Sequence, residues 1–164
     1  MKRLLIVRHA KAEKSAPRGG DFARPLAPRG EADAAEMGRR LARDKTHPDT
    51  IVTSPAERAL ATARLVAREL DFPWEEIRTV KPIYLAGVGS LLDVVRDLDD
   101  GAELALLVGH NPGVSELAQE LVRNFSQELP TAAVVAIDLP ADTWAGVKRV
   151  SGSLRSFDYP KNRP

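Results

Sequence analysis

Cysteine is absent from this sequence of 164 residues, which excludes disulfide bonds, a thiolate nucleophile and metal sites built on cysteine. Aromatic residues make up only 5% of the chain, too few for a surface on which nucleobases would stack. Acidic and basic side chains nearly balance, and the formal net charge of +1 gives no broad attraction to polyanions. We therefore expect no nucleic acid and no membrane surface among its partners.

Long apolar runs are also missing. No stretch reaches the roughly 18 residues of a membrane span, and the apolar run from Leu4 to Val7 is too short for the core of a signal peptide. The hydrophobic fraction of 43% is nevertheless typical of a folded protein, and the length suits one domain. These features predict a single domain over residues 1–164 and a cytoplasmic location.

Short apolar runs alternate with amphipathic segments along the first three quarters of the chain. The patterns predict strands at 3–8, 49–53, 74–80 and 104–108, and helices at 29–44, 54–70, 87–98 and 114–125. Ser54 and Pro55 are residue types that favour the start of a helix. This order predicts an α/β protein, a three-layer α/β/α sandwich with a mostly parallel central sheet.

Two other regions have a different character. Residues 10–28 show no period and predict a long loop, which in a compact protein is often functional. In the last third, residues 132–139 and 144–150 look like two strands joined by a turn at 140–142. We expect these two strands to form an antiparallel pair, followed by an irregular tail.

Charged and imidazole side chains gather at the ends of the predicted strands, where parallel sheets bind ligands. Arg8 and His9 follow the first strand, Arg58 lies one turn into the helix after the second, and His110 follows the fourth. Each has an ordinary alternative explanation, as a solvated charge, a turn histidine or part of a salt-bridged helix face. Their joint placement at one edge of the sheet favours a shared site. His47, in a polar loop, is expected at the surface.

Three segments carry these residues: Leu-Leu-Ile-Val-Arg-His-Ala-Lys-Ala at 4–12, Ser-Pro-Ala-Glu-Arg-Ala-Leu-Ala-Thr-Ala at 54–63, and Val-Gly-His-Asn-Pro at 108–112. In this order they resemble the histidine phosphatase superfamily, which has the phosphoglycerate mutase-like fold. The short chain and the segment Arg-Pro-Leu-Ala-Pro-Arg-Gly at 24–30 are most similar to SixA-type phosphohistidine phosphatases.

The resemblance implies a role for each matching residue. His9 would accept the phosphoryl group, Arg8 and Arg58 would hold its oxygens, His110 would complete the pocket, and Arg24 would face the phosphate. A neutral His9 needs one ring nitrogen bonded to a fixed acceptor, for which a backbone carbonyl at the strand end is suited. Such chemistry requires neither a metal nor a cofactor, and we expect none.

One departure from the family pattern lies beside the nucleophile, where Ala10 replaces the usual glycine of Arg-His-Gly. A second concerns the general acid, because mutase-type members carry a glutamate after the third strand. Here residues 81–90 contain no carboxylate, and we expect Glu13, Asp21 and Glu57 to be solvated charges.

The missing acid bears on the substrate, because the imidazole of phosphohistidine leaves more readily than an alkoxide. The short chain also leaves little room for a lid, which suits a phosphorylated side chain on a protein. We therefore expect phosphohistidine on a protein as the substrate. A phosphatase for a small phosphate ester or phosphoanhydride is the alternative, and a non-catalytic phosphate-binding module is disfavoured because all four site residues are present.

Overall fold

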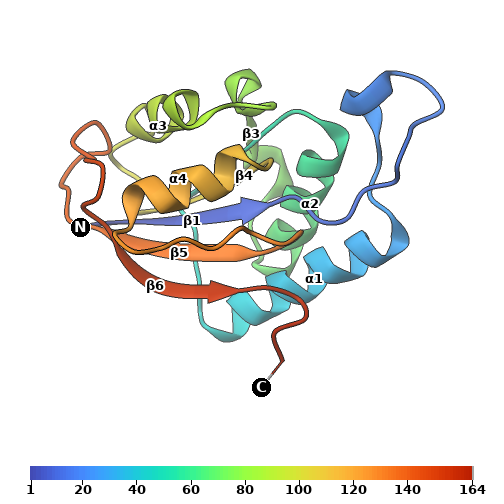
Figure 1. Ribbon diagram of the computed structural model, residues 1–164. Helices are drawn as coiled ribbons and strands as arrows, with labels where there is room; N and C mark the ends of the chain where they lie inside the picture. Colours follow the sequence, from blue (N-terminus) through green and yellow to red (C-terminus); the bar gives the residue numbers. More distant parts are fainter. Residues whose placement is uncertain (164) are drawn as a thin grey trace.

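The computed structural model describes residues 1–163, in which a central sheet lies between two layers of helices (Figure 1). The strands are β1 (Lys2–Arg8), β2 (Thr50–Thr53), β3 (Arg78–Thr79), β4 (Leu104–Gly109), β5 (Val134–Leu139) and β6 (Ser153–Asp158). The α-helices are α1 (Pro28–Arg43), α2 (Glu57–Glu69), α3 (Val88–Arg96) and α4 (Gly113–Leu121). Short 3-10 helices are η1 (Gly20–Ala23), η2 (Trp74–Glu76) and η3 (Lys81–Ile83).

The six strands lie in the order β3-β2-β4-β1-β5-β6. Strands β3, β2, β4 and β1 are mutually parallel, whereas β5 runs antiparallel to both β1 and β6. The sheet is therefore mostly parallel, and the ends of β1, β2 and β4 meet at one edge. This arrangement confirms the predicted α/β/α sandwich.

Both faces of the sheet are buried, which explains why β1 is apolar at successive positions. Leu4 and Ile6 pack in a core with α3 and α4, while Leu5 and Val7 pack in a second core with α1 and α2. Successive side chains of a strand point to opposite faces, so one apolar run serves two cores. Within residues 1–163, no helix has both the length and the apolar character needed to cross a membrane.

Several element boundaries differ from those predicted. Helix α2 begins at Glu57 rather than at Ser54, because Ser54 and Pro55 remain outside the helix at the end of β2. The Ser54 hydroxyl instead accepts a hydrogen bond from the Ala56 amide at 3.2 Å. The predicted strand at 74–80 is reduced to Arg78–Thr79, since residues 74–76 form a 3-10 helix.

The prediction of a strand at 144–150 is wrong. Trp144 is fully buried, and its indole N–H donates to the Ala102 carbonyl at 2.8 Å. Apart from Trp144 and Val147, residues 144–150 are exposed, so this stretch is a surface loop anchored in the core by its indole. Strand β6 comes later, at Ser153–Asp158, in the region expected to be an irregular tail. Its residues are mostly exposed at the sheet edge, which is why their apolar pattern is weak.

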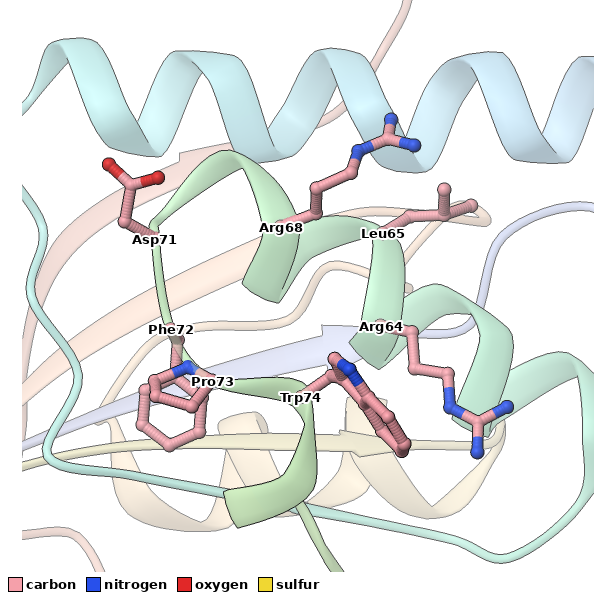
Figure 2. A pocket seen from close by; sticks show the side chains of 7 residues that line it. All are labelled: Arg64, Leu65, Arg68, Asp71, Phe72, Pro73 and Trp74. Carbon is pink, nitrogen blue, oxygen red and sulfur yellow. The ribbon is translucent and has the colours of Figure 1, made fainter.

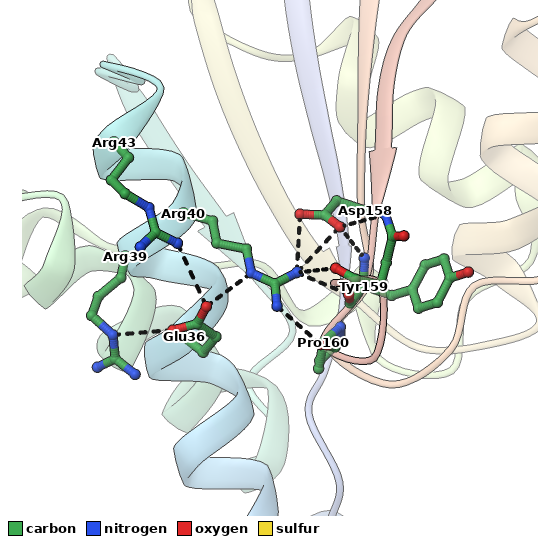
Figure 3. Close-up of polar contacts among 8 residues, drawn as sticks. Glu36, Arg39, Arg40, Arg43, Asp158, Tyr159 and Pro160 are labelled. Carbon is green, nitrogen blue, oxygen red and sulfur yellow. Dashed lines mark hydrogen bonds and ion pairs between the residues drawn. The ribbon is translucent and has the colours of Figure 1, made fainter. Parts of the chain in front are cut away.

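The segment after β6 is held against α1 by one arginine (Figure 3). Arg40 donates from Nη1 to the Asp158 carboxylate and to the Tyr159 carbonyl, and from Nη2 to the Pro160 carbonyl, at 3.0–3.3 Å. Its Nε donates to Glu36 on the same helix at 2.9 Å. The planar guanidinium therefore joins the helix to a segment more than a hundred residues away in the chain.

Candidate active site

The ends of β1, β2 and β4 are joined by backbone hydrogen bonds, which bring three distant segments together. The His9 amide donates to the Gly109 carbonyl at 3.0 Å, and the Ser54 amide donates to the Val108 carbonyl at 3.1 Å. The imidazole rings of His9 and His110 lie with their centroids 5.2 Å apart. The two histidines expected at the strand ends are thus neighbours in the structure.

The ring of His9 is held in one tautomer. Its Nδ1 lies 2.7 Å from the Ala10 carbonyl, and because a carbonyl can only accept, Nδ1 carries the proton. This backbone carbonyl is the kind of acceptor that the sequence analysis predicted. The other nitrogen, Nε2, keeps its lone pair; it makes no hydrogen bond within residues 1–163 and is not closed off from solvent.

The charge state of His9 follows from its surroundings. Burial and the nearby cations Arg58 and Arg8 together lower the pKa of His9 to about 4, against the opposing effect of the Ala10 hydrogen bond. The imidazole is therefore neutral near pH 7. A neutral ring with a free, accessible Nε2 has the form needed for nucleophilic attack.

Ala10 fits its position without strain. Its backbone φ is not positive, and its amide donates to the Thr62 hydroxyl at 2.9 Å. Thr62 in turn donates to the Arg58 carbonyl at 2.7 Å, so this hydroxyl links the loop after β1 to helix α2. The departure from Arg-His-Gly thus requires no left-handed backbone here.

Arg8 reaches across the end of the sheet to the loop that precedes β5. Its Nη1 donates to the Leu129 carbonyl at 2.9 Å, and the Asn111 side chain donates to the same carbonyl at 2.9 Å. The Leu129 amide donates to the Ser115 hydroxyl at 2.9 Å, which fixes this acceptor. The Nε of Arg8 is buried and has no partner among the described residues.

Arg58 is not part of an exposed helix face, because only 3% of the residue is accessible. Its Nη1 donates to the Asp21 carbonyl at 2.8 Å, and its Nη2 donates to the Asp21 carboxylate at 3.0 Å. Two further groups donate to the same carboxylate: Arg24 Nη1 at 2.9 Å and the Tyr84 hydroxyl at 2.7 Å. The expectation that Asp21 is merely solvated is therefore wrong.

The hydrogen bonds from Tyr84 and Arg24, together with Arg58, hold the pKa of the Asp21 carboxyl well below its usual range. Asp21 is consequently ionised near pH 7 and has no proton to donate to a leaving group. Glu13 and Glu57 are exposed, as expected. The same Asp21 hydrogen bond raises the pKa of Tyr84.

His110 is more enclosed than His9, with 3% of its surface accessible. Its Nε2 lies 2.8 Å from the Ser54 hydroxyl, while its Nδ1 is buried without a partner among the described residues. Burial lowers the pKa of His110 to about 3, and the neighbouring His9 and Arg58 add to the effect. Without a bound anion His110 is therefore neutral rather than a cation.

Three residues of this cluster are not predicted as site residues from the sequence. The sequence predicts Ser54 as the start of a helix and Asp21 as a solvated charge, and it gives no prediction for Tyr84. The position of Ser54 at a strand end was a usable signal. No sequence signal places Asp21 beside Tyr84, because the two lie 63 residues apart and meet only through the loop and η3.

This geometry agrees with the comparison of the sequence with protein families. The model of the histidine phosphatase superfamily (branch 1) matches residues 4–83, which include Arg8, His9 and Arg58. The uncharacterized protein Rv1276c of Mycobacterium tuberculosis is 30% identical over 166 aligned residues, covering 94% of this chain and 100% of that protein. The chain belongs to the histidine phosphatase superfamily.

Solved structures of SixA proteins share the fold of this histidine phosphatase. The protein histidine phosphatase SixA in complex with tungstate has a TM-score of 0.82 and 24% identity, over 98% of each chain. A SixA structure from Nakamurella multipartitia has a TM-score of 0.80 and 26% identity, over 98% of this chain and 96% of that one. The fold is therefore the phosphoglycerate mutase-like fold of SixA, as the sequence predicted.

Other features of this histidine phosphatase lie away from the site. A groove of about 720 Å³ at the far end of α2 is lined by residues that include Arg64, Arg68 and Trp74 (Figure 2). Arg64 lies over the Trp74 ring, 5.7 Å from its centroid. Arg68 is ten residues beyond Arg58 on α2, so about 15 Å of helix separates these two arginines. His47 is exposed, as expected.

Metal-binding side chains do not cluster in the described part of the chain. No group of three or more His, Asp or Glu residues within residues 1–163 has an arrangement that could hold a metal ion. The positive charge near His9 comes instead from the guanidinium groups of Arg8, Arg24 and Arg58.

Proposed function

We propose that residues 1–164 act as one metal-independent phosphatase domain that removes phosphoryl groups from phosphohistidine on a protein. The observation that carries this proposal is the state of His9. Its Nδ1 is tied to the Ala10 carbonyl, and its neutral Nε2 is accessible beside two arginines. The name of the related SixA structure, a protein histidine phosphatase, supports the same substrate class. A cytoplasmic location remains part of the proposal.

The proposed reaction has two displacements. In the first, Nε2 of His9 attacks phosphorus, the bond from phosphorus to the substrate imidazole breaks, and that imidazole takes a proton from solvent. Arg8 and Arg58 stabilise the negative charge on the transferring phosphoryl oxygens. In the second, water attacks phosphorus, the bond to Nε2 breaks, and the water proton that does not stay on phosphate goes to solvent.

His110 and Arg24 would act on the same phosphoryl group. The His110 ring lies beside that of His9, and the arrival of an anion there would favour the protonated form of His110. Arg24 already neighbours the phosphate-binding Arg58 through Asp21. Helix α4 begins at Gly113, three residues after His110, and would add the positive end of a helix dipole.

The choice of substrate rests on the leaving group. Asp21 is the carboxylate closest to Arg58, and its low pKa leaves it without a proton to give. An enzyme without a general acid favours leaving groups that depart with little help, such as the imidazole of phosphohistidine. The partner we propose is therefore a phosphorylated protein.

Trapping the intermediate tests this proposal. A protein phosphorylated on histidine is mixed with the enzyme, quenched during turnover and analysed by mass spectrometry, with His47→Ala as control for the site assignment. We expect a phosphoryl group on His9 and turnover of the phosphoprotein well above that of sugar phosphates and nucleotides. Turnover confined to small phosphates would instead support the alternative of a small-molecule phosphatase. Phosphate binding without any turnover would indicate a non-catalytic module.

A further inference from the structure

Four rings form a continuous row from the molecular surface to the nucleophile. The centroids of Phe22 and Tyr84 are 5.1 Å apart, those of Tyr84 and His110 are 5.5 Å apart, and those of His110 and His9 are 5.2 Å apart. The first two pairs are edge-to-face, with interplanar angles of 87° and 77°. These spacings lie within the range of favourable aromatic contacts.

The row runs from exposed to buried. Phe22 is 44% accessible, Tyr84 is half-buried, and the two histidines are at most 9% accessible. A leaving group that belongs to a protein must extend from the site toward solvent. Tyr84 lies against His110, and its hydroxyl bonds the Asp21 carboxylate that also binds Arg58. Tyr84 and the accessible Phe22 therefore border the site on its exposed side.

The two outer rings are held in place. The Tyr84 hydroxyl donates to Asp21 at 2.7 Å, and Asp21 immediately precedes Phe22 in η1. One carboxylate therefore couples the position of the Tyr84 ring to the segment that carries Phe22 and to Arg58. Phe22 packs on Tyr84 with one part of its ring and leaves the rest accessible, so the ring can also contact a bound molecule.

We propose that Phe22 and Tyr84 form an aromatic wall that selects a planar leaving group and disfavours aliphatic ones. For the proposed function, on which this inference rests, that group is the imidazole ring of phosphohistidine. An imidazole ring that leaves past these residues can make the same edge-to-face contact that Phe22 and Tyr84 make with each other. An aliphatic chain of equal size gains only apolar contact there.

Binding of two phosphonates tests the wall without any dependence on leaving-group reactivity. Phenylphosphonate and cyclohexylphosphonate carry the same charged group on rings of similar size, and neither has a hydrolysable P–O bond to its ring. Their inhibition constants are measured against a small aryl phosphate. We expect phenylphosphonate to bind about fivefold more tightly, as one aromatic contact of about 1 kcal/mol provides.

The variant Phe22→Leu keeps an apolar side chain but removes the ring. We expect it to bring the ratio of the two inhibition constants close to one. The melting temperature should change little, because Phe22 is 44% accessible and leucine keeps an apolar side chain beside Tyr84. Trp74→Leu is the matched control, since it removes an exposed aromatic ring outside the site, and it should leave the ratio as in the wild type. Equal binding of the two phosphonates to the wild type, or an unchanged ratio in Phe22→Leu, overturns the proposal.

These outcomes are separable from those of the proposed function. If Phe22→Leu abolishes the preference for phenylphosphonate while phosphohistidine is not hydrolysed, the selection by the aromatic wall is supported and the assigned substrate is wrong. If phosphohistidine is hydrolysed through His9 while Phe22→Leu keeps the preference, the proposed function is supported and the selection by the aromatic wall is wrong.

Discussion

Asp21 accepts two hydrogen bonds from the Arg58 guanidinium: its carboxylate lies 3.0 Å from Nη2 and its carbonyl lies 2.8 Å from Nη1. These bonds join the long loop after β1 to the first turn of α2. The Nε of Arg58 makes no hydrogen bond among the described residues and is not closed off from solvent. Asp21 therefore orients Arg58, and in the proposed function the open edge of the guanidinium would bind a phosphoryl oxygen.

Replacing Asp21 tests this orienting role. In Asp21→Ala, Arg58 loses a charge-assisted contact of about 1.5 kcal/mol, so kcat/KM for an aryl phosphate should fall about tenfold and inorganic phosphate should inhibit more weakly. Asp21→Asn keeps an oxygen in place and should recover part of the loss. Glu13→Ala removes an exposed carboxylate from the same loop and serves as control. Tighter phosphate inhibition in Asp21→Ala would mean that Asp21 blocks the site instead.

Removal of the proposed nucleophile should abolish activity. His9→Ala leaves no other accessible imidazole at the strand ends, because His110 is bonded to Ser54 and enclosed. The hydrolysis of an aryl phosphate, followed by release of the phenolate, measures the effect, and circular dichroism checks the fold. His47→Ala, at an exposed histidine, should keep full activity. Residual activity of His9→Ala within tenfold of the wild type would remove His9 from this role.

Chelation should leave turnover unchanged, because the positive charge is assigned to arginines. The enzyme is dialysed against EDTA, and the rate of aryl phosphate hydrolysis is compared before and after Mg²⁺ or Zn²⁺ is added back. We expect equal rates in all three conditions. An activity that disappears with EDTA and returns with one metal ion would contradict the assignment of Arg8 and Arg58.

The two buried histidines should make stability depend on pH. Their folded-state pKa values, about 4 for His9 and about 3 for His110, lie below the unfolded value of about 6.5. As the pH falls, the unfolded chain therefore takes up protons before the folded chain does. The contribution of the neutral rings to the free energy of unfolding is complete above pH 6.5 and is lost as the pH falls toward 4 for His9 and 3 for His110.

Between pH 6 and pH 5 each of these histidines should lower the free energy of unfolding by about 1 kcal/mol. Urea unfolding at the two pH values measures the change, and His9→Gln should remove about half of the histidine contribution. A free energy of unfolding that is equal at pH 6 and pH 5 in the wild type would contradict the burial of two neutral rings.

Arg40 should stabilise the chain end beyond β6. Arg40→Lys keeps the charge but loses the planar fork, and we expect the free energy of unfolding to fall by about 2 kcal/mol. Amide hydrogen exchange should rise at residues 159–163. Arg39→Lys changes an exposed neighbour that bonds to Glu36 on the same helix, at 3.3 Å, and is the matched control. Equal exchange in the two variants would show that Arg40 does not hold this segment.

The sequence by itself determined the layered fold and the residues at the strand ends. A short apolar run bounded by charge, such as Leu4 to Val7, favours a strand covered on both faces, and this pattern depends on neighbouring residues alone. Because parallel strands end at one edge, Arg8, His9 and His110 could be assigned to one site before their geometry was known. The motifs then indicated the family.

Only the tertiary structure decided which side chains complete that site and in what state. Asp21 and Tyr84 meet across 63 residues, and the loop of Trp144 replaces a predicted strand because its indole enters the core. The neutrality of His9 and His110 likewise arises from burial beside cations. Hydrogen bonds, burial and charge all depend on distances in space, and chain segments far apart in sequence set those distances only when they pack together.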